Sequence, residues 1–402
     1  MLDVVMVGIG GYGNANLKPL LSDAIQIPFR IVGAVDPNPS RCNHLQQLQA
    51  RNVPIFATLE EFFAQSRADL AILSTPIHLH APQTRYAVTH GAHVLCEKPL
   101  CATTDQWRQM TQARDGANRH VAIGYQWSFS QAIQALKADI LAGHFGQPRR
   151  MRTIVLWPRG EDYYSRNDWA GMKRNRRGDW VLDSPVNNAC AHYLHNMLYL
   201  LGDRVDRSAV PTHVSAELYR AQAIDNYDTA ALRCRTESGV EVLFIVSHSI
   251  AKACEPRFSL EFEKATIEYD GGADHSIVAR FADGTVRNYG RPDGPSDQKI
   301  HATMDAILKG QPSLCGIEAA SAHLRTMWAA QFSTPQIVEF PQDLRRFEGE
   351  SGRRRTWVAD LDAALHRCYD EWRLPAELGI AWAKPGVEVL VAETDERSTP
   401  PA

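Results

Sequence analysis

The sequence predicts an α/β protein of two domains, a doubly wound parallel sheet followed by an α/β domain with a mainly antiparallel sheet. Three observations predict it. A glycine-rich turn lies between an apolar run and a helical pattern at the N-terminus, helices and short apolar runs alternate up to residue 125, and long strand-like runs fill residues 149–281. With 402 residues, 44% of them hydrophobic, the chain can bury two cores.

The first element is a strand over residues 2–7 that runs into a glycine loop and then into a helix over residues 14–21. Gly8 permits the tight turn, Gly10 lets the backbone approach a pyrophosphate, and Gly13 lets helix and strand pack closely. The free N–H groups of the helix N-terminus then face the anion. This order predicts a Rossmann dinucleotide-binding domain over residues 1–125. A mere glycine-rich turn is the competing interpretation.

Cofactor choice depends on the end of the second strand, residues 29–35, which is followed by Asp36. A carboxylate there accepts hydrogen bonds from the adenosine ribose hydroxyls and repels a 2′-phosphate, so NAD is the predicted cofactor. Arg41 can reach a 2′-phosphate, which keeps NADP as the alternative.

Two further strands end in polar residues at the same sheet edge. The strand over residues 68–73 precedes Ser74, Thr75 and Pro76, and the strand over residues 93–96 precedes Glu97-Lys98-Pro99. Open parallel sheets hold their ligands at the carboxyl ends of the strands. The predicted cofactor contacts are therefore Gly8, Ile9, Gly10, Tyr12, Gly13, Asp36, Arg41, Ser74, Thr75, Pro76, His80, Glu97 and Lys98.

Helical patterns separate these strands, and the pattern changes after residue 125. A second domain is predicted over residues 126–335 and a C-terminal extension over residues 336–402. The second domain should contain a helix over residues 187–201 that closes over the sheet near the nicotinamide. Further predicted helices cover residues 40–51, 82–90, 104–118, 129–142, 298–309, 316–330 and 358–372. Predicted strands cover residues 149–156, 212–218, 228–235, 240–246, 257–269 and 276–281, and residues 394–402 should fray.

Three segments together resemble the Gfo/Idh/MocA oxidoreductases, the family of glucose–fructose oxidoreductase and inositol dehydrogenase. They are Val7-Gly8-Ile9-Gly10-Gly11-Tyr12-Gly13, Thr75-Pro76-Ile77-His78-Leu79-His80, and residues 91–100 with Glu97-Lys98-Pro99. The resemblance implies a Rossmann domain, a second domain with a large open sheet, and sugar or polyol substrates. It also implies a cis Lys98–Pro99 peptide bond and face-to-face pairing of the sheets in a homodimer or homotetramer.

Lys98, His192 and Asn188 are the catalytic candidates. The Lys98 ammonium can stabilise the alkoxide character that develops on a substrate hydroxyl as hydride leaves the carbon. In the family a histidine at the position of His192 follows an aspartate by four residues, and it can act as general base. Here Asn188 occupies the aspartate position and cannot carry a proton, while the nearest aspartate is Asp183. A hydrogen-bonded helix histidine without a catalytic role is the competing interpretation of His192.

Aromatic and basic residues suggest the substrate pocket. Residues 149–180 interleave arginines with tryptophans and tyrosines, a composition that suits an anionic or large glycoside, although a solvated loop or an oligomer contact explains it equally well. The predicted substrate contacts are Lys98, Tyr125, Trp127, Trp157, Arg159, Asn188, His192 and His195. For Tyr125, Trp127 and His195 a packing role competes with this prediction.

Net charge, hydropathy and cysteine count limit the partners and the location that we expect for the protein. A net charge of −3 argues against a nucleic-acid partner held by a global field, and no apolar run is long enough to span a membrane. The first strand begins at once, so no secretory signal is expected and the cytoplasm is the expected location. Eight scattered cysteines contain no CxxC pair, so we expect reduced thiols and no metal site.

Three functions fit these features. The leading one is an NAD(P)-dependent oxidoreductase that moves hydride between the nicotinamide and a carbinol carbon of a sugar, polyol or glycoside in carbohydrate metabolism. An alternative is a redox-neutral NAD-dependent glycosidase of the same fold, which oxidises a ring hydroxyl, eliminates the aglycone and then reduces the sugar again. The second alternative is a non-catalytic sensor that binds nucleotide and sugar.

Overall fold

The computed structural model describes residues 1–294 and 297–401 and divides into two compact units. Unit 1 comprises Met1–Ser130 and Asp293–Ser321, and unit 2 comprises Gln131–Pro292 and the chain from Ala322 onward. The predicted division had placed all of residues 126–335 in the second domain. The return of Asp293–Ser321 to unit 1 is not visible in a local pattern, because a helical periodicity does not say which sheet the helix packs against.

Unit 1 is built on a six-stranded parallel sheet in the order β3-β2-β1-β4-β5-β6. The strand order reverses at β1, so the carboxyl ends of β1 and its neighbour β4 form the switch point at which open parallel sheets bind their ligands. The predicted Rossmann sheet is confirmed. Its strands are β1 Leu2–Val7, β2 Phe29–Val35, β3 Ile55–Phe56, β4 Leu70–Leu73, β5 His93–Cys96 and β6 Val121–Ile123, and its helices are α1 Gly13–Leu20, α2 Leu45–Ala50, α3 Leu59–Gln65, α4 Ile77–Thr89, α5 Thr104–Ala117 and α9 Asp297–Lys309.

Unit 2 is built on a ten-stranded mixed sheet in the order β14-β13-β12-β11-β7-β10-β9-β8-β15, with β18 also paired to β8. Only the β7–β10 and β8–β15 pairs are parallel, so the predicted, mainly antiparallel sheet is confirmed. The strands are β7 Pro148–Leu156, β8 Pro211–Arg220, β9 Thr229–Thr236, β10 Glu241–Ser247, β11 Cys254–Phe262, β12 Ala265–Asp270, β13 Ile277–Phe281, β14 Val286–Gly290, β15 Val338–Glu339 and β18 Val389–Leu390, and a separate hairpin joins β16 Arg345–Glu348 to β17 Arg355–Val358. The helices are α6 Gln131–Leu141, α7 Glu161–Ser165, α8 Ala191–Leu200, α11 Leu361–Glu371 and α12 Val391–Asp395, together with α10 Ile317–Ser333, which begins in unit 1 and belongs to unit 2 from Ala322 onward.

Three local predictions are wrong. The single strand predicted over residues 257–269 is the hairpin β11–β12, which turns at Glu263 and Lys264. The predicted helix over residues 40–51 is a 3-10 turn followed by α2. The tail expected to fray at Thr394 and Asp395 is buried, because Trp328 Nε1 donates to the Thr394 carbonyl at 2.9 Å and Arg325 pairs with Asp395 at 2.8 Å.

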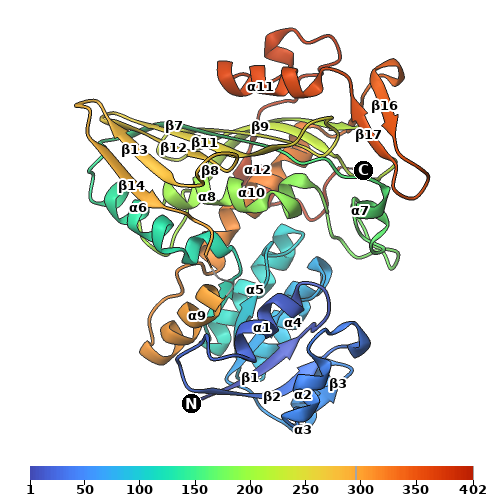
Figure 1. Ribbon diagram of the computed structural model, residues 1–402, viewed down its shortest axis with the longest axis vertical. Helices are drawn as coiled ribbons and strands as arrows, with labels where there is room; N and C mark the ends of the chain where they lie inside the picture. Colours follow the sequence, from blue (N-terminus) through green and yellow to red (C-terminus); the bar gives the residue numbers. More distant parts are fainter. Residues whose placement is uncertain (295–296, 402) are drawn as a thin grey trace. The chain divides into compact units, whose positions relative to one another are not determined.

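Helices lie against both faces of the central strands of the unit 2 sheet (Figure 1). Helices α6 and α8 lie on one face, α11 of the C-terminal extension lies on the other, and the β16–β17 hairpin lies beside one end of the sheet. A strand covered on both faces is apolar along its length, as β10 is in residues 242–246. Among the helices of the described residues, none is long and apolar enough to cross a membrane.

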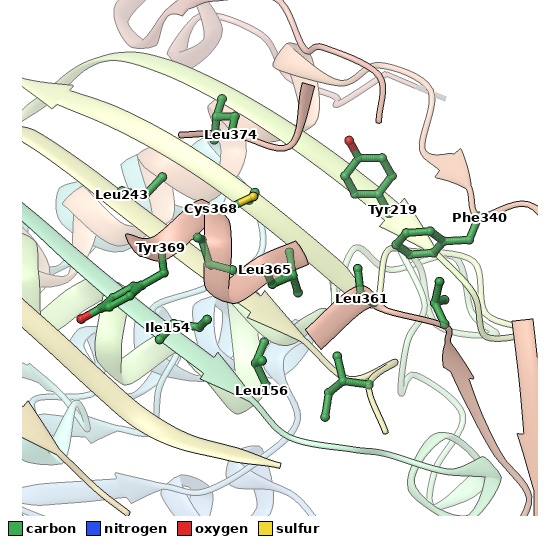
Figure 2. Packing of buried hydrophobic residues seen from close by; sticks show 14 of the residues in the cluster. Ile154, Leu156, Tyr219, Leu243, Phe340, Leu361, Leu365, Cys368, Tyr369 and Leu374 are labelled. Carbon is green, nitrogen blue, oxygen red and sulfur yellow. The ribbon is translucent and has the colours of Figure 1, made fainter. Parts of the chain in front are cut away.

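The extension is attached to the sheet by an apolar cluster (Figure 2). Leu361, Leu365 and Cys368 of α11 are fully buried against Ile154 of β7 and Leu243 of β10. The rim of this contact is formed by arginines stacked on aromatic rings. The guanidinium of Arg150 lies 4.0 Å from the Trp372 ring centroid, and that of Arg152 lies 4.3 Å from the Tyr369 ring centroid. The extension is thus part of the core of unit 2.

Replacing Leu365 by Ala tests that assignment. We expect the change to lower the free energy of unfolding by about 2–5 kcal/mol, because it removes a fully buried leucine and leaves a cavity. Leu308→Ala on α9 is the matched control, since Leu308 is 54% exposed and its loss should cost less than about 0.5 kcal/mol. Urea unfolding followed by circular dichroism measures both. Equal midpoints for the two variants would show that the extension does not stabilise the sheet.

Candidate active site

The glycine loop has the close backbone contacts that a dinucleotide-binding loop requires. Gly8 has a φ of +79°, and a Cβ there would lie 2.8 Å from the Ser74 carbonyl oxygen. A Cβ on Gly13 would lie 2.0 Å from the Gly8 carbonyl oxygen, so only glycine lets α1 begin this close to β1. At these glycine positions the loop therefore exposes its backbone at the carboxyl end of β1.

Asp36, directly after β2, is bonded to this loop. Its Oδ2 accepts hydrogen bonds from the backbone N–H of Ile9 at 2.9 Å and of Gly10 at 3.2 Å. Arg41 lies beside the same loop, since a Cβ on Gly10 would meet the Arg41 Cβ at 3.2 Å. The carboxylate thus fixes the loop at the position where the sequence predicts the adenosine ribose, and the arginine is the neighbouring cation.

The loops after β4 and β5 are tied together by His80. Its Nδ1 lies 2.7 Å from the Pro99 carbonyl oxygen and its Nε2 lies 2.9 Å from the Thr75 carbonyl oxygen. Burial lowers the pKa of His80, although both carbonyls oppose that effect. With both ring nitrogens directed at backbone carbonyls, His80 holds the two loops together, which favours a supporting role over the predicted contact with cofactor.

The Glu97-Lys98-Pro99 segment follows β5 and contains a cis peptide bond, Lys98–Pro99, as the resemblance implied. Lys98 is partly exposed, whereas Glu97 is buried. The Glu97 carboxylate forms an ion pair with Lys299 of α9 and accepts a hydrogen bond from Asn16 Nδ2 at 3.0 Å. Sequence reasoning missed Lys299 and Asn16, because neither lies in a motif and Lys299 is distant in the chain.

In unit 2 the helix predicted over residues 187–201 is interrupted. A π-helical turn, Pro185–Ala189, is followed by Cys190 and then by α8, so Asn188 and His192 do not lie on one regular helix. Asn188 Nδ2 donates to Asp183 Oδ1 at 2.7 Å, and Asp183 Oδ2 accepts from the Gly171 N–H at 2.6 Å. Position 188 has no carboxylate of its own, but the Asn188 side chain is hydrogen-bonded to the carboxylate of Asp183.

Aromatic and basic residues of unit 2 form a continuous cluster next to His192. The Trp157 ring meets the Tyr193 ring edge-to-face at 5.8 Å. The guanidinium of Arg159 lies 5.6 Å from the Trp157 ring centroid and 5.1 Å from that of Tyr163, and Arg166 stacks on Tyr163 at 3.6 Å. Trp157 and Arg159 are thus joined to the chain around His192, as predicted residues of one site would be.

Three predicted substrate residues lie in the interior instead. Tyr125 is fully buried, and Trp127 is buried with its Nε1 donating to Asp293 Oδ1 at 2.9 Å. His195 is buried in stacking contact with Tyr199, and burial, with His323 and His192 nearby, holds its pKa well below the usual value. None of the three presents surface to a ligand, which favours the packing role for each.

Residues 1–294 and 297–401 contain no group of three or more His, Cys, Asp or Glu side chains placed to hold a metal ion. The features that do converge are the glycine loop, Asp36 and the polar strand ends of a parallel sheet. Together they define unit 1 as a dinucleotide-binding domain of the Rossmann class.

Comparison with known proteins identifies the family. The family model described as an oxidoreductase family with an NAD-binding Rossmann fold matches residues 2–125, and the GFO/IDH/MocA C-terminal domain model matches residues 133–268. Both matches together cover more than half of the chain. The chain therefore belongs to the GFO/IDH/MocA oxidoreductase family.

Individual relatives are distant. The inositol 2-dehydrogenase of Klebsiella pneumoniae is 24% identical over 85% of this chain and 97% of its own length. The 1,5-anhydro-D-fructose reductase of Ensifer adhaerens is 30% identical, but over 33% of this chain and 39% of that protein. A dehydrogenase of Comamonas testosteroni likewise matches over only 37% of its length. The chain thus spans less than half the length of these two curated relatives.

Solved structures share the fold. The WlbA dehydrogenase of Chromobacterium violaceum, determined with NADH and UDP-GlcNAcA, has a TM-score of 0.66 at 21% identity over 82% of this chain and 93% of its own. An oxidoreductase of Desulfitobacterium hafniense, described as NADPH-dependent, has a TM-score of 0.67 at 16% identity over 98% of both chains. The similarity to that protein therefore extends over nearly the whole length of both chains.

Proposed function

We propose that the protein is an NAD(P)-dependent oxidoreductase that moves hydride between the nicotinamide and a carbinol carbon of a sugar, polyol or glycoside. The observation that carries the proposal is that the dinucleotide-binding loop after β1 and the Glu97-Lys98-Pro99 segment after β5 lie at the same edge of one parallel sheet. The relatives named as an inositol 2-dehydrogenase and a 1,5-anhydro-D-fructose reductase support the substrate class. When bound, the nicotinamide supplies the hydride chemistry, and the protein supplies binding, orientation and proton handling.

Binding of the cofactor, orientation of the substrate and proton handling are assigned to different residues. Glycine-loop N–H groups bind the pyrophosphate, and Asp36 selects the ribose hydroxyls over a 2′-phosphate, so NAD is preferred. The Lys98 ammonium donates a hydrogen bond to the substrate oxygen and stabilises negative charge there. His192 takes the hydroxyl proton, and Asn188 orients the sugar while bonded to Asp183.

Arg159 points to an anionic substrate. Its Nε is buried without a hydrogen-bond partner among the described residues, whereas its Nη1 donates to the Pro158 carbonyl at 3.1 Å. A carboxylate or phosphate on the sugar would supply the missing acceptor. The neighbouring Trp157 ring would stack on the sugar face.

Arg159→Met tests this selectivity. The variant should lose about 10–100-fold in kcat/KM for a sugar acid or sugar phosphate and much less for the corresponding neutral sugar, since a charge-assisted hydrogen bond contributes about 1.5–3 kcal/mol. Arg177→Met, in an exposed part of the same loop, is the matched control. Steady-state assays on matched charged and neutral sugars give the ratio. An equal loss for both would remove the anionic proposal.

We propose a homodimer or homotetramer, with a restriction on its interface. In unit 2, α11 covers the sheet face formed by β7 and β10, so that part of the face is not available for a second copy. Pairing would have to use the remainder of the sheet, toward β13 and β14. Light scattering of the purified protein measures the mass, and a mass of one chain at micromolar concentration would rule out both assemblies.

A further inference from the structure

We propose that Lys299 is a positioning residue of the active site: its buried ammonium holds Glu97 and thereby fixes the segment that presents Lys98. The inference rests on the proposed function only for its catalytic readout. Lys299 lies near the start of α9, in the segment that returns to unit 1 after strands β7–β14 of the unit 2 sheet. No motif predicts it.

The pair between Lys299 and Glu97 is buried on both sides. The Lys299 side chain is 1% exposed and the Glu97 side chain 9%, and Nζ donates to Glu97 Oε1. Burial disfavours the ammonium charge, but the Glu97 carboxylate and the Tyr12 hydroxyl outweigh it and raise the pKa of Lys299. The ammonium is therefore charged at neutral pH and anchors the carboxylate.

Both Glu97 oxygens are confined. Asn16 Nδ2 donates to Oε1 at 3.0 Å and also to Ser74 Oγ at 2.8 Å, which connects the carboxylate to α1 and to the end of β4. On the other side, a Cβ on Gly124 would lie 2.9 Å from Oε2, so the backbone after β6 packs directly on the carboxylate. Lys299 supplies the only positive charge bonded to this group among the described residues.

Lys299 also reaches the glycine loop. Its Nζ lies 3.5 Å from the Tyr12 hydroxyl and 4.8 Å from the Tyr12 ring centroid, and that hydroxyl donates to Gln126 Oε1 at 3.3 Å. One ammonium thus links the loop expected to bind the pyrophosphate with the segment that carries the proposed catalytic lysine.

Lys98 lies between two supports. On its N-terminal side the Glu97 side chain is held by Lys299 and Asn16, and the Glu97 N–H donates to the Leu73 carbonyl at 2.9 Å. On its C-terminal side His80 lies 2.7 Å from the Pro99 carbonyl oxygen. A displacement of about 1 Å of a catalytic group can cost about 100-fold in rate, so loss of one support should reduce turnover more than cofactor binding.

A structural role for the Lys299–Glu97 ion pair predicts how the effects of single and double substitutions should rank. Removing one partner of a buried ion pair leaves an uncompensated charge, whereas replacing both by neutral groups of similar size is often tolerated. Lys299→Met should therefore be more harmful than the double change Glu97→Gln with Lys299→Met. Lys299→Arg, which keeps the charge, should recover part of the loss.

The experiment combines hydrogen exchange with kinetics. In Lys299→Met we expect faster amide exchange in the peptide covering residues 97–101, a kcat lowered about 10–100-fold, and an NADH dissociation constant within about threefold of the wild type. Lys309→Met is the matched control, since Lys309 is on the same helix and its side chain is 57% exposed. It should leave exchange, kcat and NADH affinity unchanged.

Equal exchange at residues 97–101 in Lys299→Met and Lys309→Met would overturn the inference. If Lys299→Met does not fold, the double variant decides, because it contains no unpaired buried charge: exchange at residues 97–101 faster than in Lys309→Met supports the role, and equal exchange contradicts it. If the wild-type protein fails to reduce NAD with every sugar and polyol tested, the proposed function fails. The exchange comparison still decides the role of Lys299 in that case.

Discussion

Lys98→Met should abolish most of the turnover while leaving cofactor binding intact. We expect kcat to fall about 10³-fold, within the range of about 10²–10⁴ that a positioned proton-handling group contributes. The methionine preserves the length of the side chain but cannot donate a hydrogen bond to the substrate oxygen. Because Lys98 is partly exposed and lies after the end of β5 at Cys96, the change should not disturb the strand before it.

Two measurements separate chemistry from binding in this variant. Stopped-flow or steady-state assays give kcat, and quenching of protein fluorescence gives the NADH dissociation constant, which should stay within about threefold. Lys18→Met on α1 is the control, because Lys18 is exposed and lies outside the site. Turnover by Lys98→Met equal to that of Lys18→Met would remove Lys98 from the mechanism.

Asp36→Ser should change the cofactor preference. Loss of the carboxylate removes the repulsion of a 2′-phosphate and the acceptor for the ribose hydroxyls, and Arg41 remains beside the loop as a cation. We expect the ratio of NAD affinity to NADP affinity to fall about 100-fold, in line with the contribution of charge-assisted hydrogen bonds. NAD binding itself should weaken further, because Asp36 also holds the Ile9 and Gly10 N–H groups.

Calorimetric titration of both cofactors into the wild type, Asp36→Ser and the exposed control Asp23→Ser gives the two ratios. An unchanged ratio in Asp36→Ser would mean that this carboxylate does not select the cofactor. A wild-type preference for NADP would assign that role to Arg41 instead.

The fold and the cofactor loop could be predicted from sequence because their signals are local. Gly8 and Gly13 occupy positions that a Cβ would block, so the turn can be recognised from residue type and spacing alone. The Lys98–Pro99 cis bond followed from the resemblance and is confirmed. The alternation of strands and helices up to residue 125 likewise contains the order of a parallel sheet.

The remaining features depend on contacts between distant segments. Nothing in the pattern around Lys299 indicates that it will be buried against Glu97, 202 residues away. Asn188 was correctly seen as a departure, but its bond to Asp183 depends on the π-helical turn that periodicity does not reveal. Tyr125 and Trp127 follow a strand end, where pocket and core positions look alike, and they are buried.

The most direct test of the proposed chemistry is the transfer of label from a sugar to the nicotinamide. The wild-type protein is incubated with NAD and a panel of sugars, polyols and glycosides, including charged members, deuterated at the carbinol carbons. Nicotinamide absorbance and aglycone release are followed together. We predict net accumulation of deuterium-labelled NADH with at least one compound. Release of an aglycone without net NADH would indicate the redox-neutral glycosidase, and binding of NAD with neither product would contradict catalysis altogether.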